Sequence, residues 1–458
     1  MTNEATNTTY AQVLAFLEEG RRAEAAALIE PLLPPDQVEI FTQLPIHYQT
    51  RLIKVLAVNE AANIFEFLDD DEAALLAQNL DIDSLIRVLN EMEPDEAADL
   101  LGDLGPELRE QSLERITDAS DIKTLLRYPD DTAGGLMTLD YYAFPEDTPV
   151  GEVFNYIRSQ ATRDEEIPFV FAVDNAGKLK GIVRLSDLIR AHPQQYLSLV
   201  MNTQFISIEA KQDQEIASQL LNRYDLLALP VVDEKERMIG VITIDDAIEA
   251  LEEEATEDIY KSAGILSPRD SQAVKSDLMV SGPIWKSWLV RIPFLLVTMI
   301  GGMLAGGVIG VYEEALETVV ALAFFIPVVM DMGGNSGTQS VGIFIRGFVL
   351  GQIDTKQFSK HLLREIVIGL GLGIILGSIS GVIATLWQGS SDIGLVVGLA
   401  IVCTITLATS LGFIVPLVIE KLGIDPAVAS EPIITTIKDI TGMLIYFFFA
   451  TLFVSNLI

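Results

Sequence analysis

Two short segments of the sequence place oxygen-bearing side chains inside strongly apolar surroundings. The first, MDMGGNSGTQS at residues 330–340, contains Asn335 and Thr338. The second, ASEPIITTIKDITG at residues 429–442, contains Asp439. A carboxylate within a membrane span is energetically costly and usually marks a transport path. Carboxylate, amide and hydroxyl oxygens on two separate segments therefore predict a path for a hard cation.

The candidate residues of this path offer side-chain oxygens or uncovered backbone. They are Asp439, Asn335, Gly333, Gly334, Thr338, Thr435 and Glu431. Three alternatives stay open: the glycines could serve close helix packing, Asp439 could lie at the membrane interface, and Lys438 could extend to the membrane surface. Because Lys438 lies about 100° around a helix from Asp439, we do not expect the two side chains to pair.

Glycine and polar residues interrupt the apolar pattern at 330–340. Irregular backbone at membrane depth is tolerated only where it is buried in protein or lines water, so we expect irregular backbone here, with glycine carbonyls free to accept hydrogen bonds. The chain has one cysteine and three histidines, so sulfur or imidazole metal sites are not expected. Mg²⁺ gives up its water reluctantly, and a path lined by such oxygens suits the hydrated ion. The same groups could pass Mn²⁺ or Co²⁺.

Five segments near the C-terminal end are apolar enough to cross a bilayer, for which about 20 residues suffice. They cover residues 292–312, 318–345, 366–391, 393–419 and 440–458. Residues 281–458 hold 8 basic and 11 acidic side chains, and residues 1–280 carry the remaining net charge of −32. Basic residues border alternate ends of the spans, which predicts a cytoplasmic N-terminus and an outside C-terminus. The overall charge of −35 argues against nucleic acid as a partner.

The acidic part of the chain contains two kinds of repeat. EAANIF at 60–65, EAALLA at 72–77 and EAADLL at 96–101 predict short helices of a superhelical array, whose acids we interpret mostly as solvated faces. Further on, FVFAVDNAGKLKGIVRLSDLI and ALPVVDEKERMIGVITIDDAI repeat with an offset of 59 residues. Each copy predicts a strand, a turn, a second strand and a helix opened by an aspartate.

An unusually acidic helix is predicted next, at residues 245–264, DDAIEALEEEATEDIYKSAG. Like charges at helical spacing repel one another. The segment is therefore either a solvated connector or a gate in which bound cations bridge the acids.

Taken together, these motifs resemble the MgtE family of Mg²⁺ channels over essentially the whole chain. The resemblance implies a multidomain fold: an α-helical superhelical N domain at 1–130, an α/β pair of tandem CBS domains at 131–250, an acidic connecting (plug) helix at 245–280, and an all-α pore domain of five transmembrane helices at 281–458. It also implies a homodimer in a bacterial-type plasma membrane. Its pore would recognise hydrated Mg²⁺ through Asp439 and Asn335.

In this family, cytosolic Mg²⁺ bound between the N domain, the CBS pair and the plug helix holds the channel shut. The regulatory ligands that the resemblance implies are Asp95, Asp99, Asp225, Asp246, Glu249, Glu254 and Glu257. CBS pairs often bind adenine nucleotides, which suggests ATP at Thr243 and Asp246, although the first repeat has Arg184 where Ser or Thr is usual. Glu431 stands where the family has Gly or Asn, and we expect Glu431→Gly to alter conductance or ion selectivity.

The sequence thus predicts a Mg²⁺-selective, channel-like transporter for gradient-driven uptake, closed by cytosolic Mg²⁺. A broader Mn²⁺ or Co²⁺ transporter is one alternative. A CBS-regulated anion transporter is another, but it would need basic residues facing its substrate, whereas these spans offer acids. A purely structural or sensing protein would leave Asp439 replaceable. An enzyme is not expected, because no nucleophile–base set or phosphate-binding GxxxxGK[ST] loop is found.

Overall fold

The structure is a computed structural model that describes residues 3–117, 119–159, 168–262, 265, 284–349 and 351–454. By its internal contacts the chain divides into two compact units, Met1–Glu254 and Ala255–Ile458. Each unit is described by itself below.

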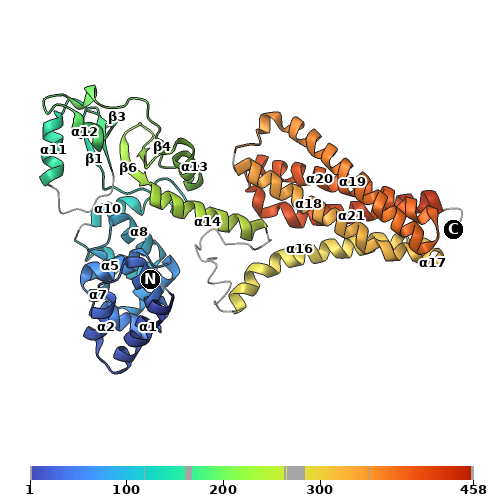
Figure 1. The fold of residues 1–458 in the computed structure, drawn as a ribbon, viewed down its shortest axis with the longest axis horizontal. Coiled ribbons are helices and arrows are strands. Elements are labelled where there is room, and N and C mark those ends of the chain that lie inside the picture. Colours follow the sequence, from blue (N-terminus) through green and yellow to red (C-terminus); the bar gives the residue numbers. More distant parts are fainter. Residues whose placement is uncertain are drawn as a thin grey trace. The chain divides into compact units, whose positions relative to one another are not determined.

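Short helices form the first part of the first unit (Figure 1). They are α1 (Asn3–Glu18), α2 (Arg22–Ile29), α3 (Pro34–Thr42), α4 (Ile46–Ile53), α5 (Val58–Glu66), α6 (Asp70–Asn79), α7 (Ile82–Leu89), α8 (Pro94–Asp103), α9 (Pro106–Leu113) and α10 (Ala119–Leu125). Proline opens α3, α8 and α9, a position where its missing N–H costs nothing. Each helix is too short to be stable alone, so the array depends on the apolar stripes that the repeated motifs supply.

Two similar β modules follow. The first contains β1 (Tyr142–Pro145), α11 (Val150–Ser159), β2 (Phe169–Val173), β3 (Leu179–Arg184) and α12 (Leu185–Arg190); a 3-10 turn, η1 (Leu197–Leu199), then leads into the second, which contains β4 (Ile208–Glu209), α13 (Gln214–Tyr224), β5 (Ala228–Val232), β6 (Met238–Thr243) and α14 (Ile244–Ser262). In each sheet the outer strands flank the middle one, which pairs in parallel with the first strand and antiparallel with the last. The predicted internal repeat is therefore confirmed at the level of topology.

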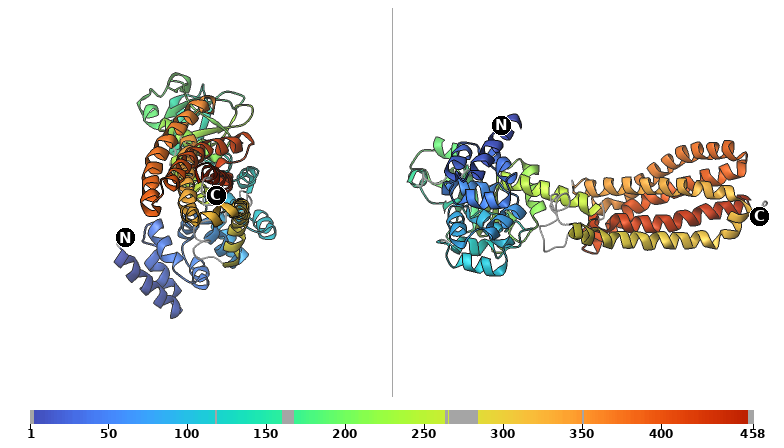
Figure 2. Two further views of the ribbon diagram at one scale, coloured as in Figure 1. Left: turned by 90° about the vertical axis from the view of Figure 1, so that its right-hand side faces the viewer. Right: turned by 90° about the horizontal axis from the view of Figure 1, so that it is seen from below.

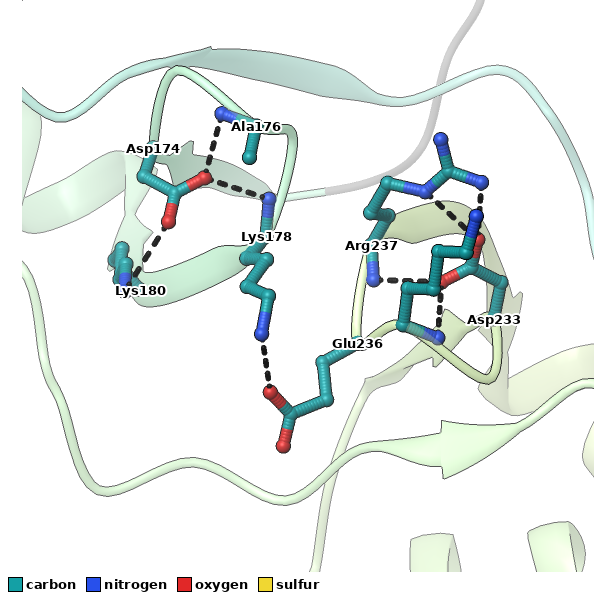
Figure 3. A network of polar contacts seen from close by, with 8 residues as sticks. Asp174, Ala176, Lys178, Lys180, Asp233, Glu236 and Arg237 are labelled. Atoms are coloured by element: carbon teal, nitrogen blue, oxygen red, sulfur yellow. Dashed lines mark hydrogen bonds and ion pairs between the residues drawn. The ribbon is translucent and has the colours of Figure 1, made fainter.

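The repeat extends to the hydrogen bonds of the β turns (Figure 3). Asp174 Oδ1 accepts from the backbone N–H groups of Ala176 and Lys178, at 2.8 and 3.0 Å. Its counterpart Asp233 Oδ1 accepts from those of Lys235 and Arg237, both at 2.9 Å. Aspartate recurs at this point because its short carboxylate can satisfy the N–H groups of its own turn.

One apolar core joins the helical array to the second β module, whereas the first β module has a cluster of its own around Val153 and Val170. The shared core includes Leu101 of α8, Leu229 of β5, Ile242 of β6 and Ala247 of α14, each at most 1% exposed. The helical array and the second β module therefore share a core, and this places α8 and the start of α14 in one packed body.

The second unit is a bundle of long helices, shown from two directions in Figures 1 and 2. Its elements are α16 (Ile284–Val311), α17 (Glu313–Thr318), η2 (Val320–Phe325), α18 (Ile326–Val349), η3 (Thr355–Gln357), α19 (Phe358–Gln388), α20 (Ser391–Lys421) and α21 (Pro426–Val454). Five stretches are long and apolar enough to cross a membrane: Ser287–Val311, Val320–Phe348, Phe358–Gln388, Ser391–Lys421 and Ile433–Phe453. The prediction of five spans is confirmed.

The expectation of irregular backbone at residues 330–340 is wrong, because this segment lies inside the continuous helix α18. Helical hydrogen bonds within α18 engage the glycine carbonyls, so they are not available in the way that the sequence suggested. The small residues instead allow close packing: a Cβ atom at Gly337 would lie 3.4 Å from Ile434 Cγ2 of α21.

Candidate functional site

Three membrane helices, α18, α20 and α21, meet around Thr404 of α20. A Cβ atom at Gly333 of α18 would lie 2.7 Å from Thr404 Cγ2, and one at Gly442 of α21 would lie 3.2 Å from the same atom. Any larger residue at these positions would push the helices apart. Glycine on both neighbours of Thr404 therefore brings polar groups of three helices into one small region.

Asp439 lies in the middle of α21, close to this convergence. Its carboxylate is 16% exposed, and its Oδ1 atom is buried without a hydrogen-bond partner. The Lys438 Nζ atom lies 3.1 Å from that oxygen. The expectation that Lys438 would not pair with Asp439 is therefore wrong, and with 9% of the residue exposed, Lys438 does not extend to the surface either.

The glycines of α18 explain how Lys438 reaches its neighbour. A Cβ atom at Gly334 would lie 2.5 Å from Lys438 Nζ, so the lysine passes directly over a position that has no side chain. The ammonium group also donates to the backbone oxygen of Met330, at 3.4 Å. A four-carbon flexible stem can cover the 100° that separates adjacent residues on a helix. The sequence argument considered only the direction of the Cα–Cβ bonds.

Two hydroxyl groups of this helix bundle are also buried without a hydrogen-bond partner: Thr404 Oγ1, between Gly333 and Gly442, and Thr436 Oγ1, against Gly301 of α16. Thr436 precedes Asp439 by three residues, so the two share a face of α21. Buried polar atoms of proteins are nearly always hydrogen-bonded, and each exception calls for an explanation. Thr436 lies in the polar segment at 429–442 that the sequence indicated, although it was not among the candidate residues. No sequence signal indicates Thr404.

The opposite face of α18 is exposed and polar. Asp331, Asn335, Thr338 and Gln339 are exposed, whereas the intervening Gly333, Ser336, Gly337 and Ser340 are buried. The exposed side chains recur at intervals of three and four residues, which places them on one side of the helix. Such a face is costly against lipid tails.

The membrane unit contains two further acids, one that was predicted from the sequence as a site residue and one that was not. The Glu431 side chain lies outside the part of the structure that is described, although its backbone lies in α21. Glu365 of α19, which sequence reasoning missed, is 6% exposed and accepts a hydrogen bond of 2.6 Å from Ser340 Oγ. Thr435, another predicted residue, is half-buried beside Thr436.

A second group of acids, the α8 acidic cluster, lies in the first unit and comprises Glu93, Asp95, Glu96, Asp99 and Asp246. Burial and then the charge of Asp246 raise the pKa of Asp95 to about 7. Burial also raises the pKa of Asp99, and then Asp130 adds its charge. The structure thus brings Asp95 and Asp246, about 150 residues apart in sequence, into one electrostatic environment.

Glu93 and Glu96 are members that sequence reasoning took for solvated acids. Burial, followed by repulsion from Asp95, raises the pKa of Glu93 to about 7 and that of Glu96 to about 10. Asp95 Oδ1 is buried without a hydrogen-bond partner. Oxygen donors of this kind suit Mg²⁺, but within the described residues no three acidic, histidine or cysteine side chains are already arranged as a metal site.

The other predicted regulatory acids do not join this cluster. Asp225 is exposed at the end of α13, where its φ of 53° ends the helix. Glu249 is exposed on α14, and Glu254 accepts a hydrogen bond of 3.0 Å from Gln214. Glu257 pairs at 2.8 Å with Lys261, whose ammonium also pairs at 2.7 Å with Asp425 just before α21.

The two predicted nucleotide-binding residues contact one another. Thr243 Oγ1 donates a hydrogen bond to Asp246 Oδ2 at the junction of β6 and α14. The hydroxyl and carboxylate therefore stand at the strand-to-helix turn where the sequence predicted them.

Known proteins resemble this chain in both units. A family model described as the divalent cation transporter MgtE matches residues 326–449, the model of the MgtE intracellular N domain matches 32–131, and CBS domain models match 133–193 and 197–253. The chain is 37% identical over 329 residues to the magnesium transporter MgtE of Thermus thermophilus, covering 71% of each protein. It is 32% identical over 451 residues to that of Bacillus subtilis, covering 97% of each.

Two solved structures are similar to the first unit. The crystal structure of the soluble part of a magnesium transporter superposes with a TM-score of 0.50 at 28% identity, over 55% of this chain and 99% of that one. The cytosolic domain of the Mg²⁺ channel MgtE in complex with ATP superposes with a TM-score of 0.50 at 30% identity, over 52% of this chain and 99% of that one.

Proposed function

The chain belongs to the MgtE family of magnesium transporters, and on that premise we propose that it forms a channel-like path through which Mg²⁺ enters the cell down its gradient. It is a multi-pass membrane protein with a helical N domain, a CBS pair and five candidate membrane helices. It is a transporter and not an enzyme.

The observation that carries the channel proposal is a set of buried oxygens that have no hydrogen-bond partner, on α20 and α21. Thr404 Oγ1 lies where α18, α20 and α21 meet, and Asp439 Oδ1 and Thr436 Oγ1 lie on α21, with Thr436 against Gly301 of α16. A hydrated divalent cation offers water hydrogens to such acceptors without losing its inner water shell. Asp439 supplies the negative charge, and the hydroxyl of Thr435 adds a further acceptor beside it. Gly333 and Gly334 contribute the space between the helices.

The exposed polar face of α18 supports a homodimer. Asn335 and Thr338 would face lipid in a lone chain, at a cost that a second copy or an aqueous passage removes. We therefore propose that two copies place these faces around a common path, with the N-termini in the cytoplasm and the C-termini outside.

The α8 acidic cluster supports gating by cytosolic Mg²⁺. Its carboxylates repel one another, and a bound cation relieves that repulsion. We propose that cytosolic Mg²⁺ binds there and between the plug helix and its neighbours, and that this favours the closed channel. Glu249, Glu254 and Glu257 remain candidate ligands on the plug helix, with Asp225 at the end of α13.

A relative whose cytosolic domain was solved with ATP supports nucleotide binding at the CBS pair. We propose Thr243 and Asp246 as residues of that site, because their hydrogen bond places them at the strand-to-helix turn of the second β module.

Ion flux into liposomes tests the path. The full-length protein is reconstituted, a magnesium-sensitive dye is enclosed, and flux is driven by an inward gradient. We expect Asp439→Asn to abolish Mg²⁺ flux, whereas Asp392→Asn, which alters a carboxylate at the start of α20, should leave it intact. Undiminished flux in Asp439→Asn contradicts the proposal. Parallel runs with Mn²⁺, Co²⁺ and Ca²⁺ separate a magnesium channel from the broader alternative.

A further inference from the structure

We propose that Lys438 is an internal counter-ion of the transport path: it neutralises Asp439 between passages, and each divalent cation must compete with it for the carboxylate. The inference rests on the proposed function, because it concerns the same carboxylate. It assigns to Lys438 the role of a positioning and affinity-setting residue, and it identifies a reason for the glycine at position 334.

The first support is the burial of both charges. The side chains of Lys438 and Asp439 are 10% and 16% exposed, and their nearest charged atoms are 3.1 Å apart. An isolated charge in such surroundings is costly, and an opposite charge within contact distance offsets much of that cost. The pair is neutral overall, so the resting path does not hold an uncompensated carboxylate within the membrane.

The second support is that the lysine is held loosely. An ammonium group can donate three hydrogen bonds, yet among the described residues Lys438 has one donor contact, to Met330 at a long 3.4 Å. Its approach to Asp439 is an ion pair without hydrogen-bond geometry, because Asp439 Oδ1 has no hydrogen-bond partner. A charge that is buried but under-bonded can leave when a better cation arrives.

The third support is the space that surrounds the lysine. Its Nζ atom lies 2.5 Å from where a Cβ atom at Gly334 would stand, and its Cδ atom lies 4.0 Å from a Cβ atom at Gly333. The end of the stem therefore occupies space that is left because Gly334 lacks a side chain. A flexible side chain can change rotamer without moving a helix.

The consequence for transport follows from charge alone. A divalent cation and the ammonium group are attracted to one carboxylate and repelled by each other. The lysine therefore weakens cation binding and speeds release, and conduction requires binding that is weak enough to let the ion leave. Without the ammonium charge, Asp439 would hold a divalent cation for longer.

Concentration-dependent Mg²⁺ flux through the full-length protein in liposomes tests this role. In Lys438→Met we expect the half-saturating Mg²⁺ concentration to fall about five- to tenfold, the lower range of measured site–site couplings, with a lower maximal rate. Lys438→Arg keeps the charge and should restore the half-saturating concentration. If the lysine were only structural, its replacement would lower the maximal rate by reducing the amount of folded protein, but it would leave the half-saturating Mg²⁺ concentration unchanged. That result overturns the inference.

Two further measurements keep the outcome decisive. If Lys438→Met does not reconstitute as a monodisperse protein, Lys438→Gln is measured instead, since it keeps a donor for Met330 but carries no charge. Asp439→Asn is measured alongside. Retained flux in Asp439→Asn overturns the proposed path itself, whereas lost flux there with an unchanged half-saturating concentration in the Lys438 variants overturns only the counter-ion.

Discussion

Buried carboxylates occur in both units of the chain, but their surroundings differ. In the α8 acidic cluster, acids such as Asp95 and Glu96 face other acids, and repulsion adds to burial in raising their pKa values. In the membrane unit, Asp439 faces the ammonium group of Lys438. Within the described part of the chain no ion pair engages the acids of the α8 acidic cluster, whereas Asp439 pairs with the lysine that precedes it.

The difference fits two uses of the same chemical group. Acids that repel one another gain most from a bound cation, so cation binding there can change the shape of the protein, as a sensor requires. An acid that is already neutralised gains less, so a cation binds it briefly, as a path requires. Four predictions, ordered by expected effect, test this comparison.

The largest effect is expected from neutralising the cluster. We expect Asp95→Asn with Glu96→Gln to raise the Mg²⁺ concentration that half-protects the full-length protein from protease by about tenfold or more, because affinity follows the number of charged ligands. Glu107→Gln, which changes an exposed acid of α9, is the matched control. Unchanged protection would show that the cluster is not the cation sensor.

The next effect concerns pH. The pKa values of Glu93 and Asp95 are raised to about 7 in the folded protein, so the folded state binds more protons than the unfolded state between the ordinary carboxyl pKa and pH 7. Stability from these groups is present below that range and is lost as pH rises through it. In EDTA we expect the melting temperature to fall by several degrees between pH 5 and pH 8, and Mg²⁺ should reduce the fall at the upper end. A melting temperature that is independent of pH, or equally pH-dependent with Mg²⁺, would contradict the prediction.

The third prediction compares Gly333, which faces Thr404, with Gly334, which faces the end of Lys438. Gly333→Ala places a Cβ atom 2.7 Å from the stiff Thr404 side chain, and we expect it to lower the unfolding free energy by about 1–3 kcal/mol through overpacking. Gly334→Ala meets the mobile end of Lys438 and should cost less. Thermal unfolding of the full-length protein in detergent measures both, with Gly302→Ala, where a Cβ atom meets nothing within 4 Å, as the control. Equal losses at both positions would show that the lysine cannot yield.

The smallest effect is expected at an exposed ion pair. Lys178 and Glu236 join the turns of the two β modules at 2.9 Å, but their side chains are 41% and 79% exposed (Figure 3). Lys178→Met should change the unfolding free energy little relative to the control, because water screens such pairs. Lys235→Met in the same turn region is the control. A larger loss at Lys178 would mean that exposure does not separate this pair from the buried one in the membrane.

The sequence was sufficient to predict the features of the fold that depend on local periodicity. The five apolar stretches and the repeat that aligns Asp174 with Asp233 were predictable because hydropathy and turn chemistry are set by neighbouring residues. Glu96 was not recognised as a cluster member, since its environment is determined first by burial, which depends on the fold, and then by the charge of Asp95. Asp439 was selected because a carboxylate is costly in a membrane span and because oxygen donors occur on two spans, and its role in a transport path stays a prediction.

The pairing of Lys438 with Asp439 could not be predicted from the sequence, because it depends on a glycine without a side chain in another helix, α18. Gly334 leaves space for the end of the lysine side chain, and only the packing of α18 against α21 shows that the lysine occupies it. The helical state of residues 330–340 was missed for a related reason. Glycines usually weaken a helix, but packing against neighbouring helices stabilises the helix that contains them here.

Lys261 near the end of α14 is joined to Asp425, one residue before α21 begins. Asp439 lies fourteen residues further on, which is about 21 Å along a continuous helix. A displacement of one end of a rigid helix moves the rest of that helix. We therefore expect the Lys261–Asp425 ion pair to couple movement of the plug helix to the position of the Asp439 carboxylate.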